Sequence, residues 1–300
     1  MKLTPRLALL LTLPPLMWAG NAVVGRLVRD AVSPMTLNAM RWALAFVLLA
    51  PLARRVLASP RELLSRWRGL AVLGLLGVGC YNALQYQALR TASPLNVTLI
   101  AASLPVWMLA VGAVAFGVRP TRRQLLGALL SLAGVAVVIA RGDPQALLAV
   151  HFVSGDLLML LAIFSWAIYS WLLARPMKGL RPDDRPAWNW AEALMAQLIF
   201  GLLFASVLAG AEQVVAPAPI HWSPGLMAAL VYVAIGPSLI AYRCWGLGVA
   251  EAGPALAAFF GNLTPVFAAL ISAALLGLAP AWYHGLAFVL IGAGILVSTR

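Results

Sequence analysis

The sequence predicts an all-α polytopic membrane protein in which ten transmembrane helices form two inverted five-helix repeats. Three observations support this fold class: the composition, the number of membrane-length apolar stretches and an internal repeat. Apolar residues make up 63% of the 300-residue chain and charged residues only 10%, whereas soluble domains contain about 45 to 50% and about 25%. This composition is that of an integral membrane protein and leaves little chain for a soluble domain.

Ten apolar stretches have roughly the 20 residues that a helix needs to cross the hydrocarbon core of a bilayer. Short polar segments separate them, so each stretch is predicted to be one transmembrane helix. Lys2 and Arg6 before the first stretch would also suit a secretory signal peptide, but this stretch has a counterpart in the second half and is kept as a helix. The stretches cover residues 7–28, 34–53, 69–89, 95–118, 124–140, 156–174, 191–210, 225–245, 254–278 and 284–298.

Two parts of the chain resemble each other. Residues 69–142 match 225–300 at a shift of 156, which becomes 160 after an insertion of four residues. A duplicated membrane unit is typical of secondary transporters. Because five helices per repeat is an odd number, the second repeat enters the membrane from the opposite side, and we expect inverted repeats over 1–142 and 156–300. The aligned pairs are Gly69 with Gly225, Asn82 with Ser238, Tyr86 with Tyr242, Pro94 with Pro254, Pro105 with Pro265, Gly117 with Gly277, Pro120 with Pro280 and Gly134 with Gly294.

The formal net charge of +12 is concentrated in alternate loops. Cytoplasmic loops of membrane proteins carry such an excess of Lys and Arg. We therefore expect both termini on the cytoplasmic side of a bacterial-type inner membrane. Lipid head groups, not a nucleic acid, are the expected partner of these charges. The crowded loops hold Arg54, Arg55, Arg61, Arg66 and Arg68, then Arg119, Arg122 and Arg123, then Arg175, Lys178, Arg181 and Arg185.

Four motifs follow one another along the predicted helices: Trp18-Ala-Gly-Asn21, Arg41-Trp42-Ala-Leu-Ala, Ala102-Ser-Leu-Pro105-Val106 and Leu263-Thr-Pro265-Val266-Phe267. Their order and spacing over the whole chain resemble the EamA-type members of the drug/metabolite transporter superfamily. The resemblance implies ten helices in two inverted repeats and the movement of small metabolites, often outward, with the YddG-type amino-acid exporters as the nearest branch. The family usually has Glu after the glycine that ends helices 4 and 9, where this chain has Val118 and Leu278.

Catalytic and metal-binding constellations are absent from the sequence. Cys80 and Cys244 lie in separate helices without a partner spacing, so they are interpreted as small packing residues. His151, His221 and His284 are too scattered to predict a metal cluster and are interpreted as solvated or interfacial. The chain is therefore not expected to be an enzyme or to need a cofactor or metal.

Polar residues inside the predicted helices indicate where a cargo would bind. Such groups are costly in lipid and usually face the bundle interior or a cavity, although each could instead form an interhelical hydrogen bond worth about 0.6 kcal/mol. Together with nearby aromatic residues they are predicted to line one central cavity between the two repeats. The predicted substrate-binding residues are Trp18, Asn21, Asn82, Gln85, Tyr86, Trp107, Trp166, Tyr169, Ser238, Tyr242 and Asn262.

Prolines and one arginine are predicted to have structural or gating roles. Pro105 and Pro265 occupy equivalent helices and Pro237 interrupts the eighth, so backbone carbonyls should be freed there. Broken helices in corresponding positions indicate a transport site. Arg41 lies about two turns into the second helix, and we expect carbonyl or tyrosine partners for it in preference to a substrate carboxylate.

The sequence predicts an exporter of neutral or aromatic amino acids that works by alternating access as a monomer. Tyrosine, with an ordinary pKa of about 10, is a poor proton carrier near neutral pH. No Asp, Glu or His lies in the predicted helix interiors, so facilitated transport is expected instead of proton coupling. Efflux of lipophilic drug cations is an alternative, though it usually needs a buried carboxylate. A membrane-embedded lipid-modifying enzyme is a further alternative, for which the acidic residues are too dispersed.

Overall fold

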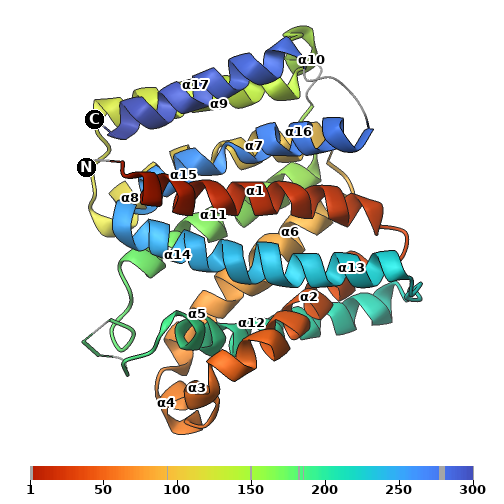
Figure 1. Cartoon of the computed structure of the whole chain (residues 1–300), viewed down its shortest axis with the longest axis vertical. Coiled ribbons are helices and arrows are strands. Elements are labelled where there is room, and N and C mark those ends of the chain that lie inside the picture. The colour runs from red at the N-terminus through yellow and green to blue at the C-terminus, as the bar shows by residue number, and fades with distance from the viewer. Residues whose placement is uncertain are drawn as a thin grey trace.

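The computed structural model describes residues 3–92, 94–148, 151–181, 183–184, 186–276 and 281–299. Within these residues all regular secondary structure is helical, which confirms the predicted class (Figure 1). The first half contains α1 (Pro5–Leu27), α2 (Pro34–Leu49), η1 (Ala50–Leu52), α3 (Arg54–Leu57), α4 (Pro60–Ser65), α5 (Trp67–Gly74), η2 (Leu75–Cys80), α6 (Tyr81–Ala88), α7 (Pro94–Ala102), α8 (Leu104–Phe116), α9 (Arg122–Ile139) and α10 (Gln145–Leu148). The second half contains α11 (Ser154–Ala174), α12 (Trp190–Val215), α13 (Pro224–Val233), η3 (Ala234–Ile240), α14 (Ala241–Ala252), α15 (Pro254–Gly261), α16 (Thr264–Leu276) and α17 (Trp282–Thr299).

The number of membrane spans agrees with the prediction. In the described part of the chain, nine helical stretches are long and apolar enough to cross a membrane, and α7 with α8, bent by 44°, make the tenth. The predicted third helix is interrupted by the π-helix η2, and the predicted ninth helix is divided into α15 and α16. Short helices α3, α4 and α10 occupy loops in which no helix was predicted. Leu278, the predicted end of the ninth helix, lies outside the described residues.

Local sequence signals set the ends of several helices. The side-chain oxygen of Asn189 accepts hydrogen bonds from the backbone N–H groups of Ala191 and Glu192, at 2.8 and 3.0 Å. The Glu192 carboxylate accepts one in return from the backbone N–H of Asn189 at 2.8 Å, so that three backbone N–H groups at the start of α12 are satisfied. At the end of α8, Gly117 has φ +67°, a left-handed conformation that glycine adopts without steric cost.

Prolines lie where helices break. Pro105 and Pro265 are each the second residue of the helix that follows a break, α8 and α16. This position tolerates proline because the first turn leaves its N–H groups unpaired. Pro237 lies inside the π-helix η3 and cannot donate to the carbonyl four residues earlier. The predicted interruptions are confirmed, whereas η2 contains no proline and was not foreseen.

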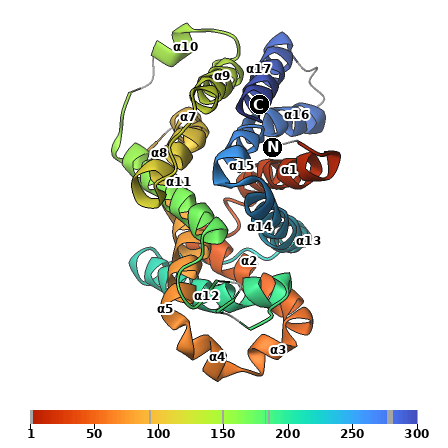
Figure 2. The same cartoon turned by 90° about the vertical axis from the view of Figure 1, so that its left-hand side faces the viewer.

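Equivalent helices of the two repeats pack against each other. α9 lies against α17, and α2 against α12; Figure 2 shows the first pair side by side when the bundle is viewed along its helices. Gly127 of α9 and Gly294 of α17 permit a close backbone approach, because a Cβ at Gly294 would lie 2.6 Å from the Gly127 carbonyl oxygen. Helices next to a pseudo-two-fold axis contact their own equivalents, so these two pairs fit a two-fold relation between the repeats.

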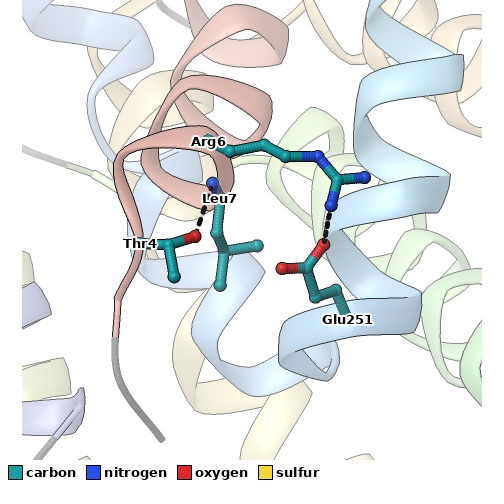
Figure 3. Close-up of polar contacts among 4 residues, drawn as sticks. All are labelled: Thr4, Arg6, Leu7 and Glu251. Carbon is teal, nitrogen blue, oxygen red and sulfur yellow. Dashed lines mark hydrogen bonds and ion pairs between the residues drawn. The ribbon is translucent and has the colours of Figure 1, made fainter.

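The two termini lie on the same side of the bundle (Figure 1). On this side Thr4 caps α1 by accepting a hydrogen bond from the Leu7 N–H at 3.2 Å. Arg6 of α1 forms an ion pair with Glu251 near the end of α14 at 3.7 Å (Figure 3). Both side chains are substantially exposed, so this pair adds at most about 1 kcal/mol of stability.

Arg66 connects two basic loops on this side. Its Nε donates to the Gly179 carbonyl and its Nη2 to the Asp184 carbonyl, each at 3.0 Å. The connection between η1 and α5, which contains α3 and α4, is thereby joined to the loop between α11 and α12. Two of the loops in which Lys and Arg are concentrated therefore lie at the same end of the bundle.

Candidate functional site

An aromatic cluster lies in the interior, where α1, α2, α6, α11 and α14 meet. Its central ring is Trp166, near the middle of α11 and only 4% exposed. The centroid of the Trp166 ring lies 5.3 Å from the ring centroids of Trp18 and Tyr81. It lies 5.1 to 5.6 Å from the other rings of the second repeat, those of Tyr169, Tyr242 and Trp245. These distances and the mostly edge-on or tilted rings suit attractive aromatic pairs. The aromatic cluster consists of Trp18, Trp42, Tyr81, Trp166, Tyr169, Tyr242 and Trp245.

Both repeats contribute rings to this cluster, and helical spacing explains how. Trp166 and Tyr169 are three residues apart, as are Tyr242 and Trp245, so each pair projects from one face of its helix. Trp18 enters from α1 and lies 5.3 Å from Trp245. The site is therefore formed between the repeats and not within either one.

Three rings of the cluster were not among the predicted site residues. Trp42 lies 5.0 Å from Tyr242, edge to face, and Tyr81 and Trp245 both contact Trp166. The sequence signal for Trp245 was its three-residue spacing from Tyr242. Tyr81 lies on the helix whose geometry the π-helix η2 changes, so a regular 3.6-residue period does not give its direction.

Arg41 of α2 is buried next to the cluster, with 1% of its surface exposed. Its Nε donates to the Ser238 hydroxyl oxygen at 3.0 Å and its Nη1 to the Asn21 side-chain oxygen at 3.4 Å. Its guanidinium carbon lies 5.3 Å from the centre of the Trp42 ring. The expected carbonyl or tyrosine partners are therefore absent from its hydrogen bonds in the described structure, and a serine hydroxyl and an asparagine amide take their place.

The break at Pro237 explains how the Ser238 oxygen comes to accept a hydrogen bond from Arg41. Proline has no N–H to donate to the Val233 carbonyl four residues earlier. The Ser238 hydroxyl donates to this carbonyl instead, at 2.7 Å. With its hydrogen committed there, the Ser238 oxygen is available as an acceptor for the Arg41 guanidinium.

Hydrogen bonds hold the two repeats together around the cluster. The Tyr242 hydroxyl donates to the Gly77 carbonyl in η2. Trp18 donates from Nε1 to the Pro237 carbonyl at 3.3 Å. Gly77 cannot carry a side chain here, because a Cβ would lie 2.6 Å from the Tyr169 ring. The backbone of the first repeat is therefore in direct contact with the tyrosines of the second.

Asn262 lies at a second polar contact between the repeats. Its amide nitrogen donates to the Ala102 carbonyl at 3.1 Å and to the Ser131 hydroxyl at 2.8 Å. Ala102 ends α7 at the break before α8, and Asn262 lies at the break between α15 and α16. At the repeat shift of 160 residues these two positions are equivalent, so the two broken helices meet at their breaks.

The remaining predicted site residues lie around these contacts. Asn82 is buried on α6, and Gln85 and Tyr86 are partly buried on the same helix. Trp107 of α8 packs edge to face against Phe164 of α11 at 5.7 Å and is not among the rings of the aromatic cluster. The structure thus joins Trp18, Trp166, Tyr169 and Tyr242 in one cluster, brings Asn21 and Ser238 to Arg41, and keeps Asn262 and Trp107 apart from them.

The acidic residues lie away from the aromatic cluster. All nine are described, and each is in a loop, in the short helix α4 or in the first or last turn of a spanning helix. Asp156 and Glu192 are buried at the starts of α11 and α12. Glu212 near the end of α12 accepts hydrogen bonds from the backbone N–H groups of Met35 and Thr36, both at 3.1 Å, at the start of α2. These three carboxylates accept hydrogen bonds from backbone N–H groups at the starts of helices.

The described residues contain no group of three or more His, Cys, Asp or Glu side chains that could hold a metal ion. Cys80 and Cys244 are both free thiols. A hollow of about 540 Å³ lies at the end of the bundle that carries the termini, lined by residues of α9, α15 and α17 such as Arg122, Leu256 and Ser298. It shares no residue with the aromatic cluster.

Known proteins resemble this chain over nearly its whole length. An uncharacterized transporter of Archaeoglobus fulgidus is 29% identical over 97% of this chain and 96% of its own. The aromatic amino acid exporter YddG of Ancylobacter novellus is 27% identical over 90% of this chain and 88% of its own. The Salmonella typhimurium protein named a probable amino-acid metabolite efflux pump is 28% identical, with 94% and 90% covered.

The same likeness holds for the fold and for the repeats. A solved crystal structure superposes with a TM-score of 0.77 over 98% of this chain and 96% of that one, at 23% identity, which shows a common fold. The profile of the EamA-like transporter family matches twice, over residues 6–140 and 153–300. Because these two matches cover nearly all of the chain, the protein belongs to the EamA-like transporter family and is a multi-pass membrane protein.

Proposed function

We propose that the protein exports neutral or aromatic amino acids, or closely related metabolites, by alternating access of a central site between the repeats. The observation that carries this proposal is the aromatic cluster around Trp166, to which both repeats contribute. Ring faces at this point suit an apolar or aromatic side chain, and the neighbouring Asn and Ser groups suit hydrogen bonds to a zwitterion. The names of two relatives, an aromatic amino acid exporter and an amino-acid metabolite efflux pump, support the same cargo class.

The proposed transport is facilitative. Proton coupling normally needs a titratable group in the transport path. Among the described residues, the acidic side chains and the three histidines lie in loops, in α4 or in terminal turns of spanning helices. The cargo's own concentration gradient is then the driving force.

The proposed orientation puts both termini in the cytoplasm of a bacterial-type inner membrane, with the protein active as a monomer. The positive-inside rule supports the orientation, because the loops rich in Lys and Arg include the pair that Arg66 connects. The side that carries Arg6 and Glu251 is then cytoplasmic, and export carries the cargo away from it.

The test is counterflow in proteoliposomes that hold the purified protein, with a panel of labelled amino acids and lipophilic drug cations. We expect flux of neutral or aromatic amino acids with no pH difference and no membrane potential. Accumulation that requires an imposed proton gradient and collapses with an uncoupler would refute the facilitative mechanism. Flux of the cations alone would replace the proposed cargo class with drug efflux.

A pair of tryptophan variants locates the site. Trp166→Leu removes the central ring of the cluster, while Trp222→Leu removes a ring that is 60% exposed in the loop before α13. At equal protein content, we expect Trp166→Leu to lower flux of aromatic cargo by about 2- to 13-fold, which corresponds to one lost aromatic contact of about 0.5 to 1.5 kcal/mol. Equal flux in the two variants would show that the cargo does not use the aromatic cluster.

A further inference from the structure

Arg41 carries a buried positive charge that the protein leaves without an anion. Every acidic residue of the chain is described, and the ion pairs among the described residues are Arg6 with Glu251 and Arg29 with Asp30. The partners of Arg41 are instead neutral, the Ser238 hydroxyl and the Asn21 amide. A charge buried in a protein interior is normally paired, because desolvation of an unpaired ion is costly.

Several hydrogen-bond donors in this region have no acceptor, although Asn38 Oδ1, one turn earlier on α2, is itself a buried acceptor without a partner among the described residues. A guanidinium has five N–H donors, and Arg41 uses two of them within the described structure. Its neighbour Trp42 is fully buried, and the Trp42 indole Nε1 has no hydrogen-bond partner among the described residues. Two adjacent residues of α2 therefore present unused donors beside the aromatic cluster.

The missing partner has a definite chemistry. It must be an acceptor that carries negative charge, and a carboxylate fits because it accepts through two oxygens and pairs with guanidinium in a fork geometry. The aromatic rings around the same point present surfaces that suit an apolar or aromatic body on the same ligand. A ligand with a carboxylate on an apolar side chain fits both features.

We infer that Arg41 binds the carboxylate of the transported amino acid while the aromatic cluster receives its side chain. This inference rests on the proposed function and names the group of the cargo that is recognised. The ammonium group of the cargo then faces the Asn21 oxygen and the ring faces, which attract cations. Cargo that is cationic and lacks a carboxylate is repelled by Arg41.

The position of Arg41 also couples binding to the break at η3, between α13 and α14. The Ser238 oxygen accepts from the Arg41 Nε while the Ser238 hydroxyl donates to the Val233 carbonyl, to which Pro237 cannot donate. A carboxylate at Arg41 competes with Ser238 and Asn21 for the same guanidinium. Cargo binding therefore weakens the contact of α2 with η3 and α1, the elements that supply these neutral partners.

The experiment compares three labelled cargoes in proteoliposome counterflow: L-phenylalanine, L-phenylalaninamide, which lacks the negative charge, and phenethylamine, which lacks the carboxyl group altogether. The wild type is expected to prefer L-phenylalanine over the amide by about 10- to 100-fold, the effect of one hydrogen-bonded charge. In Arg41→Gln this preference should fall to near one while amide flux persists. Arg41→Lys, which keeps the charge without the fork, should restore part of the preference and raise KM for L-phenylalanine.

The matched control is Arg243→Gln. Arg243 is an exposed arginine of α14 that stacks over Trp190 at 4.5 Å, away from Arg41, and its loss should leave the preference unchanged. A purely structural role of Arg41 would lower the flux of all three cargoes equally and keep their ratio.

The outcomes separate this inference from the proposed function. If the wild type moves L-phenylalanine and Arg41→Gln keeps the full preference, the inference is overturned and the proposed function stands. If the wild type moves only phenethylamine, both are overturned. If it moves none of the three cargoes, the inference is overturned and the amino-acid panel decides the proposed function. If Arg41→Gln does not accumulate as folded protein, the inference is tested by the wild-type ratio of L-phenylalanine flux to L-phenylalaninamide flux and by the KM of Arg41→Lys for L-phenylalanine. A wild type that does not distinguish the acid from the amide refutes the inference.

Discussion

The contact between α9 and α17 provides the sharpest test of how the two repeats are joined. A Cβ added at Gly294 would lie 2.6 Å from the Gly127 carbonyl oxygen and 3.1 Å from the Ser131 nitrogen. These neighbours are backbone atoms of the facing helix, so the two helices must move apart to accept Gly294→Ala. Gly292 lies two residues earlier on α17, and a Cβ there would meet nothing within 4 Å. Gly292→Ala is therefore a control for the same chemical change on the same helix.

The expected energies follow from two opposing effects. Alanine is a better helix former than glycine by about 0.8 to 1.0 kcal/mol, which should stabilise Gly292→Ala. Gly294→Ala has the same gain, but overpacking of a tight contact costs about 1 to 3 kcal/mol. The free energy of unfolding of Gly294→Ala should thus be about 1 to 3 kcal/mol lower than that of Gly292→Ala.

Thermal or denaturant unfolding of the purified variants in one detergent measures this difference. Gly127→Ala and Gly294→Ala together form a double-mutant cycle, because a Cβ at Gly127 would lie 2.7 Å from the Gly294 carbonyl oxygen. Once one substitution has separated the helices, the second should cost less, so the two effects should not be additive. If Gly294→Ala is as stable as Gly292→Ala, the close approach of the two equivalent helices is not what stabilises this pair.

Two further predictions concern the start of α2 and the orientation. Glu212→Ala should lower the free energy of unfolding by about 1 to 2 kcal/mol, as loss of a helix cap does, because the N–H groups of Met35 and Thr36 lose their acceptor. The control is Asp30→Ala, which removes an exposed ion pair. Equal unfolding midpoints of the two variants would contradict the capping role. In a chain without Cys80 and Cys244, a cysteine at Arg61 should resist impermeant reagents applied to intact cells, whereas one at His221 should react. Both positions are exposed, but the loop around Arg61 is rich in arginine and residues 216–223 contain no Lys or Arg. Ready labelling at Arg61 from outside would reverse the proposed orientation.

The fold was predictable because its signals are local. Hydropathy over a span of about 20 residues identifies a membrane helix without reference to any other part of the chain. Prolines at 105, 237 and 265 indicate breaks because a missing N–H acts within one turn, and the structure has interruptions at all three. The repeat was visible because Pro105 and Pro265, like Pro94 and Pro254, keep a constant shift of 160 residues. The interruption at η2 had no such signal and was missed.

The site was predictable only in part, because its members come from different helices. Spacing along one helix placed Trp166 with Tyr169, but nothing in the sequence shows which helices face one another. Trp42, Tyr81 and Trp245 therefore became visible as cluster members only when α2, α6, α11 and α14 were assembled. Likewise the meeting of Asn262 with the Ala102 carbonyl depends on two breaks that lie 160 residues apart.

By itself the sequence determined the membrane class, the number of spans and the positions of the breaks at proline, since each depends on the chemistry of a short segment in lipid. The tertiary structure decided the partners of the buried polar groups. Arg41 shows the reason: its charge and depth can be read from α2 alone, but its pairing with Ser238, 197 residues away, depends on a proline that frees a carbonyl in another repeat. Hydrogen bonds are short-ranged and directional, so only the assembled helices determine which donors find an acceptor and which remain for a ligand.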